Sequence, residues 1–210
     1  MTSWLAMLVR RLNSLTEFNP RVQHWRMMRT PWPTLLVVLA YLLSLLSLTT
    51  YMKNRKPYNL TKIVRYYNIF QVVSCIGLIY MIATAGWTTG ENSFTCQPID
   101  YSENPKAMRI LRAFYMAYFL KMIELVETVF FILRKKFNQV TGLHVYHHIS
   151  TFMLAYVGTR FLGGGMLGIP VMLNCFIHVL MYFYYYLSTF GQKWQKILAS
   201  WKPKLTLMQM

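Results

Sequence analysis

Three histidines in an otherwise apolar segment are the residues of this chain best suited to chemistry. His144, His147 and His148 lie within two turns of a helix, and their side chains span an arc of roughly 100°. Ionisable groups at membrane depth are costly, so they usually face a bundle interior and mark a functional site. The spacing therefore predicts one polar patch inside a helix bundle.

Two neighbouring apolar segments each carry a polar face of their own. The segment before the histidines has a cation and two carboxylates at every third position: Lys121, Glu124 and Glu127. The segment after them has four polar residues at helical spacing: Asn174, His178, Tyr182 and Tyr185. Residues three and four apart share one face of a helix. Three helices that turn these faces inward would form a shared polar centre.

Two chemistries suit clustered histidines in a membrane. In acyl transfer, a neutral imidazole attacks a thioester, a second histidine moves protons, and an amide such as that of Asn174 stabilises the oxyanion. A non-haem di-iron centre would instead use histidines from several boxes, but this chain has five, and His24 is remote. The residues favour acyl transfer over iron. For Lys121, Glu124 and Glu127, a structural ion pair within the membrane is an equal alternative.

Composition indicates a membrane protein. Of the 210 residues, 55% are hydrophobic and 13% are charged, whereas soluble domains carry about 25% charged residues. The net charge of +16 suits an anionic leaflet or a polyanionic substrate. The basic residues punctuate apolar runs and form no single stripe, which argues against nucleic-acid binding. Three scattered cysteines are too few for a disulfide framework or a structural zinc site.

Hydropathy predicts an all-α, polytopic membrane helix bundle with five complete spans. A spanning helix needs about 20 mainly apolar residues, and five segments approach or reach that length: residues 32–52, 66–87, 114–133, 141–157 and 166–187. A sixth would begin near Lys204. Residues 1–30 are expected to form an N-terminal surface segment, and residues 31–210 one bundle that is incomplete at its C-terminus.

Basic residues in the connections predict the orientation. The first and third connections and the tail after the fifth span are rich in lysine and arginine, so the positive-inside rule places them in the cytosol. The second and fourth connections then face the lumen, and so does the N-terminus despite its arginines. Residues 1–30 lying along the membrane surface would account for that exception.

Six stretches of the chain carry a family resemblance. They are RKP at 55–57, CQPIDYS at 96–102, KMIELVETVFFILRKK at 121–136, QVTGL at 139–143 leading into HVYHH, NCFIHVLMYFYYYLS at 174–188 and LTLMQ at 205–209. In this order they resemble the very-long-chain fatty acid elongase family (ELO type) over about residues 19–210. The resemblance implies an acyltransferase, a 3-ketoacyl-CoA synthase. Such an enzyme condenses fatty acyl-CoA with malonyl-CoA and releases CO2 and CoA.

The resemblance also implies roles for the polar residues. His147, the middle histidine of the box, is expected to accept the acyl group as an acyl-imidazole. His178 and Asn174 would assist it, while His144 and His148 would shape and protonate the site. The expected substrate-binding or positioning residues are Lys121, Glu124, Glu127, Tyr182, Tyr185, Arg134, Lys135 and Lys136. Neither a metal nor another cofactor is expected.

The family fold implied is a seven-helix bundle around a closed acyl tunnel, multi-pass in the endoplasmic reticulum membrane. The expected partners are acyl-CoA, malonyl-CoA and membrane lipid, with a homodimer and the other elongation-cycle enzymes as further expectations, and no nucleic acid. Two features depart from the family. Glu127 stands where the family usually has Asp, and the chain ends as the sixth helix should begin, which predicts a C-terminal truncation. The alternative function is therefore a truncated, non-catalytic membrane protein that binds acyl-CoA or full-length elongases.

Overall fold

The computed structural model describes residues 19–201, 203 and 205, and these form helices and connections with no strand among them. The long helices are α2 (Trp32–Met52), α3 (Thr61–Ile82), α4 (Pro105–Glu124), α5 (Val126–Leu133), α6 (Gly142–Leu162), α7 (Gly168–Ser188) and the shorter α8 (Gln192–Leu198). A π-helical turn, η2 (Ala83–Trp87), continues α3, and four 3-10 turns complete the set: η1 (Pro20–Val22), η3 (Phe137–Gln139), η4 (Gly165–Leu167) and η5 (Ala199–Trp201).

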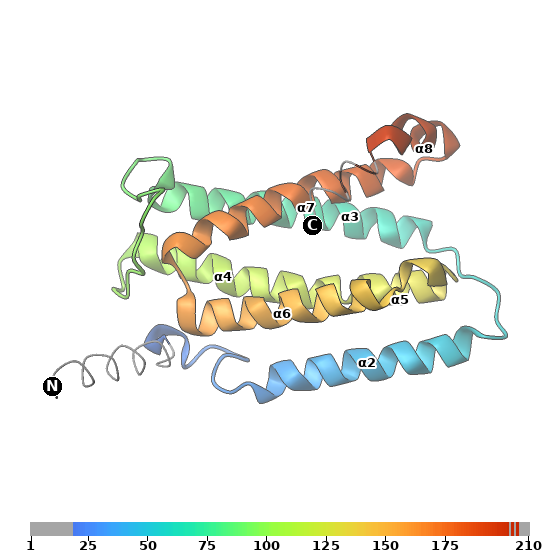
Figure 1. Cartoon of the computed structure of the whole chain (residues 1–210), viewed down its shortest axis with the longest axis horizontal. Helices are drawn as coiled ribbons and strands as arrows, with labels where there is room; N and C mark the ends of the chain where they lie inside the picture. Colours follow the sequence, from blue (N-terminus) through green and yellow to red (C-terminus); the bar gives the residue numbers. More distant parts are fainter. Residues whose placement is uncertain (1–18, 202, 204, 206–210) are drawn as a thin grey trace, which may run out of the picture.

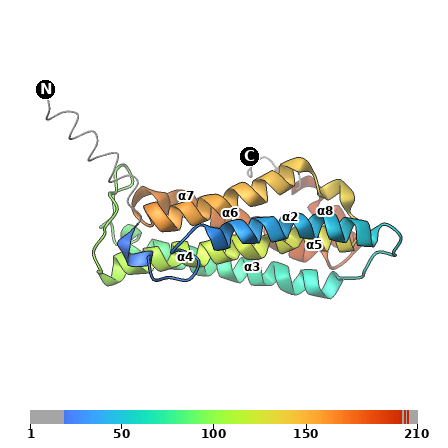
Figure 2. The same cartoon turned by 90° about the horizontal axis from the view of Figure 1, so that it is seen from below.

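Five antiparallel rods make up the bundle, with α4 and α5 forming one rod that breaks at Leu125 (Figure 1). Packing contacts join α7 to α3, α3 to α4, and α4 to α6, so these helices form an arc with α6 and α7 at its two ends. Helix α2 lies outside the arc, against α5 and α6 (Figure 2). The polar faces predicted from the sequence belong to three of the four arc helices.

Local sequence explains where the long helices begin. Pro105 occupies the first turn of α4, where its missing N–H is not needed, and the Asn104 side chain accepts the Lys106 N–H. At the start of α6 the Thr141 side chain accepts the N–H of His144. This cap fixes the first turn of the helix that carries the histidines.

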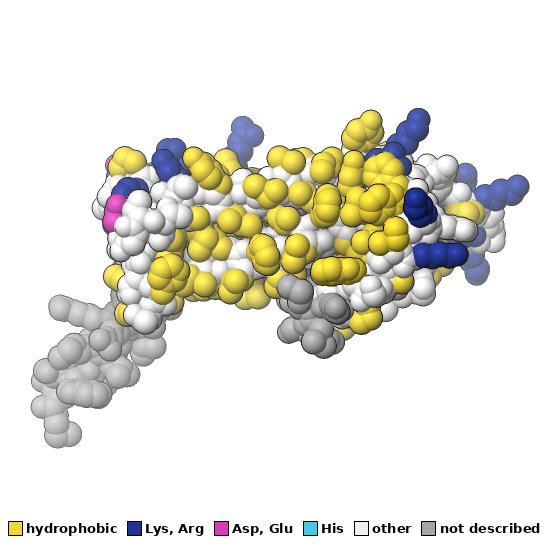
Figure 3. Space-filling view, turned by 90° about the horizontal axis from the view of Figure 1, so that it is seen from above, with side chains coloured by type: hydrophobic (Ala, Val, Ile, Leu, Met, Phe, Trp, Pro, Cys, Tyr) yellow, Lys and Arg dark blue, Asp and Glu magenta, His cyan; other side chains and the backbone are white. Residues whose placement is uncertain are grey.

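The bundle has the surface of a membrane protein. Three helical segments are long and apolar enough to cross a membrane in the described part of the chain: Trp32–Met52, Thr61–Trp87 and Gly165–Ser188. The other two rods are more polar: α4–α5 contains Lys121, Glu124 and Glu127, and α6 contains His144, His147 and His148. On the face shown in Figure 3, hydrophobic side chains cover the middle of the molecule and lysines and arginines gather toward its ends. The predicted all-α membrane helix bundle is confirmed.

The five predicted spans correspond to the five rods, with differences at their ends. The first is identical at Trp32–Met52, whereas the third begins at Pro105 instead of residue 114, and this added part includes the exposed Arg109 and Arg112. The fourth extends to Leu162 and so includes Arg160, whose guanidinium donates to the carbonyl of Met28. Residues 1–18 of the predicted surface segment, and Lys204 at the predicted start of a sixth span, lie outside the described residues.

The two ends of the bundle differ in charge. The connection from α2 to α3, the connection from α5 to α6 and the segment after α7 share one end and are basic, as expected. The opposite end carries Glu91, Asp100 and Glu103 in the connection between η2 and α4. There the Ser102 N–H lowers the pKa of the Asp100 carboxyl, which keeps it ionised. Which end faces the cytosol stays a prediction from the positive-inside rule.

Candidate active site

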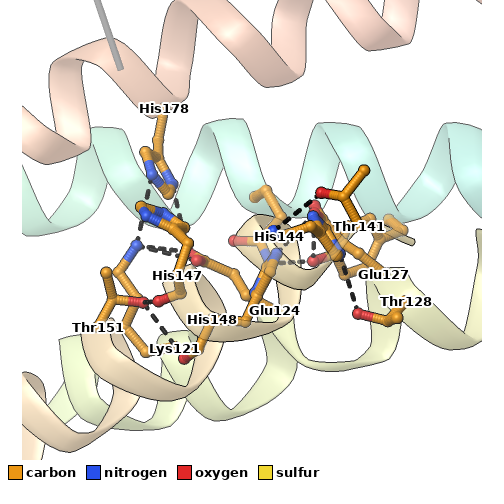
Figure 4. Close-up of polar contacts among 12 residues, drawn as sticks. Lys121, Glu124, Glu127, Thr128, Thr141, His144, His147, His148, Thr151 and His178 are labelled. Atoms are coloured by element: carbon orange, nitrogen blue, oxygen red, sulfur yellow. Dashed lines mark hydrogen bonds and ion pairs between the residues drawn. The ribbon is translucent and has the colours of Figure 1, made fainter. Parts of the chain in front are cut away.

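The polar faces of α4–α5, α6 and α7 meet in the interior of the arc (Figure 4). Lys121 and Glu124 form an ion pair, with Nζ 2.9 Å from Oε2 and with side chains only 13% and 2% exposed. His178 of α7 completes this triad: its Nδ1 lies 3.2 Å from Glu124 Oε1, and its Nε2 lies 3.4 Å from Lys121 Nζ. The triad ties α4 to α7.

Donor and acceptor chemistry fixes the protonation of His178. An ammonium group can only donate, and an ionised carboxylate can only accept. Lys121 therefore donates to the lone pair of His178 Nε2, which leaves the proton of a neutral ring on Nδ1, 3.2 Å from the Glu124 carboxylate. The ring of His178 thus lies between the cation and the carboxylate of the pair.

A second polar group centres on Glu127 of α5. Its Oε2 lies 3.6 Å from His148 Nε2, and its Oε1 accepts a hydrogen bond from the Tyr67 hydroxyl at 3.2 Å. Tyr67 in turn accepts from the Gln71 amide at 2.8 Å. This chain of contacts brings α3 into the site and orients the Glu127 carboxylate toward His148.

A third polar group involves His144 and reaches α2. The Thr128 hydroxyl lies 3.0 Å from His144 Nε2 and 2.7 Å from the Tyr41 hydroxyl. The rings of His144 and His148 are in contact, with centroids 4.3 Å apart. Neighbouring side chains thus contact two of the three histidines of α6: Thr128 contacts His144, and Glu127 contacts His148.

His147 differs from the other histidines of the site. It is exposed and lines the central cavity, and its ring packs edge-on against His148 at a centroid distance of 5.9 Å. Among the described residues, none hydrogen-bonds to either ring nitrogen of His147. Its lone pair is therefore available to a ligand in the cavity.

Three cavities lie along the interior of the arc. One of about 530 Å³ opens at the basic end and is lined by Arg134, Lys136 and Gln139 among others. A central chamber of about 260 Å³ is lined by all four site histidines. A third cavity, of about 340 Å³, is mainly apolar and is lined by residues such as Phe114, Leu154 and Gly158.

Shared lining residues connect these cavities. The basic cavity and the chamber share Glu127, Phe131, Gln139 and Tyr185. The chamber and the apolar cavity share Glu124, Asn174 and His178. The three cavities are therefore neighbours, in the order basic cavity, histidine chamber, apolar cavity.

The structure brings together most of the residues predicted from the sequence. Tyr182 is buried, with its ring against that of His178, and Tyr185 lines the first two cavities. Within the basic run, Arg134 and Lys136 line the opening, but Lys135 turns away and donates to the carbonyl of Lys53 at 3.2 Å.

Four residues of the site were not predicted: Tyr41, Tyr67, Gln71 and Thr128. Thr128 follows Glu127 directly and lies four residues after Glu124, so helical spacing places it close to the polar face. Tyr41 gives no signal of this kind, because it is a single aromatic residue in an apolar span.

No cluster of three or more histidine, cysteine, aspartate or glutamate side chains is arranged to hold a metal ion in the part of the chain that the structure describes. Three of the site histidines direct a ring nitrogen at a hydroxyl, a carboxylate or an ammonium instead. The expectation that the protein needs no metal or other cofactor stays a prediction.

The fold and the site together define a class: a multi-pass, all-α membrane protein whose interior holds a centre of histidines and carboxylates between a basic and an apolar cavity. Comparison with known proteins then identifies the family.

The family model described as "ELO: GNS1/SUR4 family" matches residues 26–210, and the chain belongs to this family. It is 41% identical to very long chain fatty acid elongase 7 of Rattus norvegicus over 94% of this chain and 70% of the relative. It is 39% identical to very long chain fatty acid elongase 4 of Homo sapiens, over 95% of this chain and 65% of the relative. Against elongase 7 of Drosophila melanogaster it is 39% identical over 91% of this chain and 58% of the relative. The chain thus spans 58% to 70% of the length of these relatives.

Proposed function

We propose that this protein acts in fatty acid elongation, as a 3-ketoacyl-CoA synthase of the endoplasmic reticulum membrane. In this reaction a fatty acyl-CoA condenses with malonyl-CoA to give 3-ketoacyl-CoA, CO2 and CoA. The observation that carries the proposal is the position of His147 in a chamber between a basic and an apolar cavity, where no described residue hydrogen-bonds to its ring nitrogens. The names of these relatives, very long chain fatty acid elongases, support a role in fatty acid elongation.

The three neighbouring cavities suit the three parts of an acyl-CoA. Arg134 and Lys136 at the basic opening would bind the phosphates of CoA by charge-assisted hydrogen bonds. The thioester would then lie in the chamber beside His147, and the acyl chain would occupy the apolar cavity. Burial of the chain would stabilise binding by about 0.8 kcal/mol for each CH2.

The first half of the proposed reaction is acyl transfer to His147. The ring nitrogen attacks the thioester carbonyl carbon, the C–S bond breaks, and CoA leaves as a thiol that takes the proton of the other ring nitrogen. The ammonium of Lys121 and the amide of Asn174, which both line the apolar cavity near His178, would stabilise the negative charge that develops on the carbonyl oxygen. The product is an acyl-imidazole.

The second half is condensation with malonyl-CoA. Loss of CO2 from malonyl-CoA breaks a C–C bond and leaves an enolate. Its carbon attacks the acyl-imidazole carbonyl, so that the new C–C bond forms and the His147 nitrogen leaves. His147 then takes a proton from water and returns to its starting state. His178 is held by Lys121 and Glu124, so its part would be to position charge beside the reacting carbonyl and not to accept a proton.

The test uses membranes that contain the full chain, supplied with acyl-CoA and labelled malonyl-CoA. We expect label in a 3-ketoacyl-CoA, its loss in His147→Ala, and its retention in His24→Ala, which removes an exposed histidine outside the site. Acyl-CoA alone should also add one acyl mass to the peptide that contains His147. Acyl-CoA binding without turnover or adduct would support the non-catalytic alternative, and chelator-sensitive oxygenation of the acyl chain would support an iron oxygenase.

A further inference from the structure

Helix α2 lies outside the arc, yet one of its side chains reaches the site. Tyr41 is only 5% exposed, and its hydroxyl lies 2.7 Å from that of Thr128. Thr128 lies 3.0 Å from His144 Nε2. We call this chain of two hydrogen bonds, Tyr41–Thr128–His144, the hydroxyl relay.

Counting donors gives the relay a direction. Within the described residues, Thr128 is the sole hydrogen-bond partner of the Tyr41 hydroxyl. If His144 Nε2 carried the ring proton and donated to Thr128, one buried hydroxyl proton would have no acceptor among the described residues: that of Tyr41 if Thr128 donated to Tyr41, or that of Thr128 if its oxygen accepted from both neighbours. A buried donor left unpaired costs about 1–3 kcal/mol. In the opposite direction each proton is used: Tyr41 donates to Thr128, and Thr128 donates to His144 Nε2.

This direction determines the tautomer of the His144 ring. A neutral imidazole has one N–H and one lone pair, so a lone pair on Nε2 puts the proton on Nδ1. His178 has the same tautomer, but its Nδ1 lies 3.2 Å from a carboxylate oxygen of Glu124. No residue in the described ranges accepts from Nδ1 of His144, and His144 lines the chamber.

We propose that Tyr41 and Thr128 are positioning residues that hold His144 as a hydrogen-bond donor to a carbonyl oxygen in the chamber. This inference rests on the proposed function for the identity of that carbonyl, the thioester of the acyl group. It assigns His144 the part of stabilising the oxyanion, because a ring whose lone pair is already bound by Thr128 does not act as a base. Donors of this kind contribute most when charge develops in a site from which water is excluded.

The tautomer can be measured without turnover. In protein labelled with 15N-histidine in detergent micelles, protonated and unprotonated ring nitrogens resonate apart, and a His144→Gln variant assigns the signals of His144. We expect protonated Nδ1 and unprotonated Nε2, and loss of this state in Thr128→Val. A ketone analogue of acyl-CoA, in which CH2 replaces the thioester sulfur, cannot transfer its acyl group. Its binding should shift the Nδ1 proton signal of His144. A protonated Nε2 in the unmodified protein, or an unshifted Nδ1 signal with the analogue bound, would overturn the proposal.

Kinetics supply the second readout, with a matched control in the same protein. Thr128→Val should lower kcat by about tenfold to a hundredfold, and Thr128→Ser, which keeps the hydroxyl, should restore it. Thr34 and Tyr118 form an equivalent buried hydroxyl pair between α2 and α4, at 2.9 Å, and no described histidine hydrogen-bonds to either hydroxyl. Thr34→Val should therefore leave kcat and the His144 tautomer unchanged.

Equal losses in Thr34→Val and Thr128→Val would show a purely structural effect and would contradict the relay. Failure of the proposed function gives a different pattern. In that case the protein would show no condensation, but His144 would still have the expected tautomer and the expected shift with the analogue. This result would contradict the proposed reaction and support the hydroxyl relay.

Discussion

Lys121 and His178 lie on different helices, yet the Nζ of Lys121 approaches the Nε2 of His178 to 3.4 Å. Glu124 lies between them: its Oε2 accepts from Lys121 Nζ at 2.9 Å, and its Oε1 lies 3.2 Å from His178 Nδ1. The buried carboxylate thus has two partners, one from its own helix and one from across the arc. The same three side chains that border the proposed reaction also link α4 to α7, so a change in one of them affects both stability and activity.

Removing the cation from this triad should destabilise the bundle. Lys121→Met keeps an unbranched stem but leaves the Glu124 carboxylate buried without its countercharge, which costs about 3–5 kcal/mol. We expect this loss in the free energy of unfolding, measured by chemical denaturation in micelles. The double variant Lys121→Met/Glu124→Gln should recover much of it, because the uncompensated charge is gone. Lys106→Met, which removes the cation of an exposed pair with Glu91, is the control; an equal loss there would refute the role of burial.

The length of the Glu127 side chain should matter for activity. Glu127→Asp shortens the side chain by one methylene and withdraws the carboxylate by roughly 1 Å from His148 and from the Tyr67 hydroxyl. A misplacement of this size lowers the reaction rate by up to about a hundredfold. We expect a lower kcat with little change in thermal stability. Tyr67→Phe should lower kcat in the same direction, since it removes the donor that orients Glu127. An Asp variant as active as the original protein would show that the contact with His148 is not used.

Filling the apolar cavity should change the preferred acyl chain. Gly158 lines this cavity, and a Cβ there would meet only the Phe114 ring at an ordinary distance of 3.9 Å. Gly158→Leu should therefore fold and shift turnover toward shorter acyl-CoA substrates, measured as kcat/KM over a series of chain lengths. Gly77→Leu adds the same group to an exposed position with no neighbour within 4 Å and should not shift the preference. An unchanged profile in Gly158→Leu would place the acyl chain elsewhere.

The turn between α6 and α7 should tolerate no side chain at Gly165. Its φ is +57°, and a Cβ would lie 2.8 Å from the carbonyl oxygen of Gln97, which accepts the N–H of Met166 at 3.1 Å. Gly165→Ala should cost about 2 kcal/mol from the left-handed backbone alone, with a further loss as the loop moves. Gly142→Ala, where a Cβ meets nothing within 4 Å, is the comparison for thermal unfolding. Equal melting temperatures for the two variants would mean that this contact does not hold the loop.

Sequence periodicity was sufficient to predict the bundle and most of its centre. Apolar runs of spanning length predicted the five rods, and one of them, α2, has the predicted bounds. Spacings of three and four placed Lys121, Glu124 and Glu127 on one face and Asn174, His178, Tyr182 and Tyr185 on another. Such predictions succeed because helical geometry alone decides which residues of one helix share a face.

The tertiary structure determined which helix faces contact one another. It brought Tyr41 of α2 to Thr128, which contacts His144, and Tyr67 of α3 to Glu127, which contacts His148. It left the ring nitrogens of His147 without a hydrogen bond from any described residue, and it separated Lys135 from Arg134 and Lys136. Periodicity could not give these partners, because it is defined about the axis of a single helix. The order of the helices around the arc, and the rotation of each about its own axis, depend on how all of their surfaces pack together.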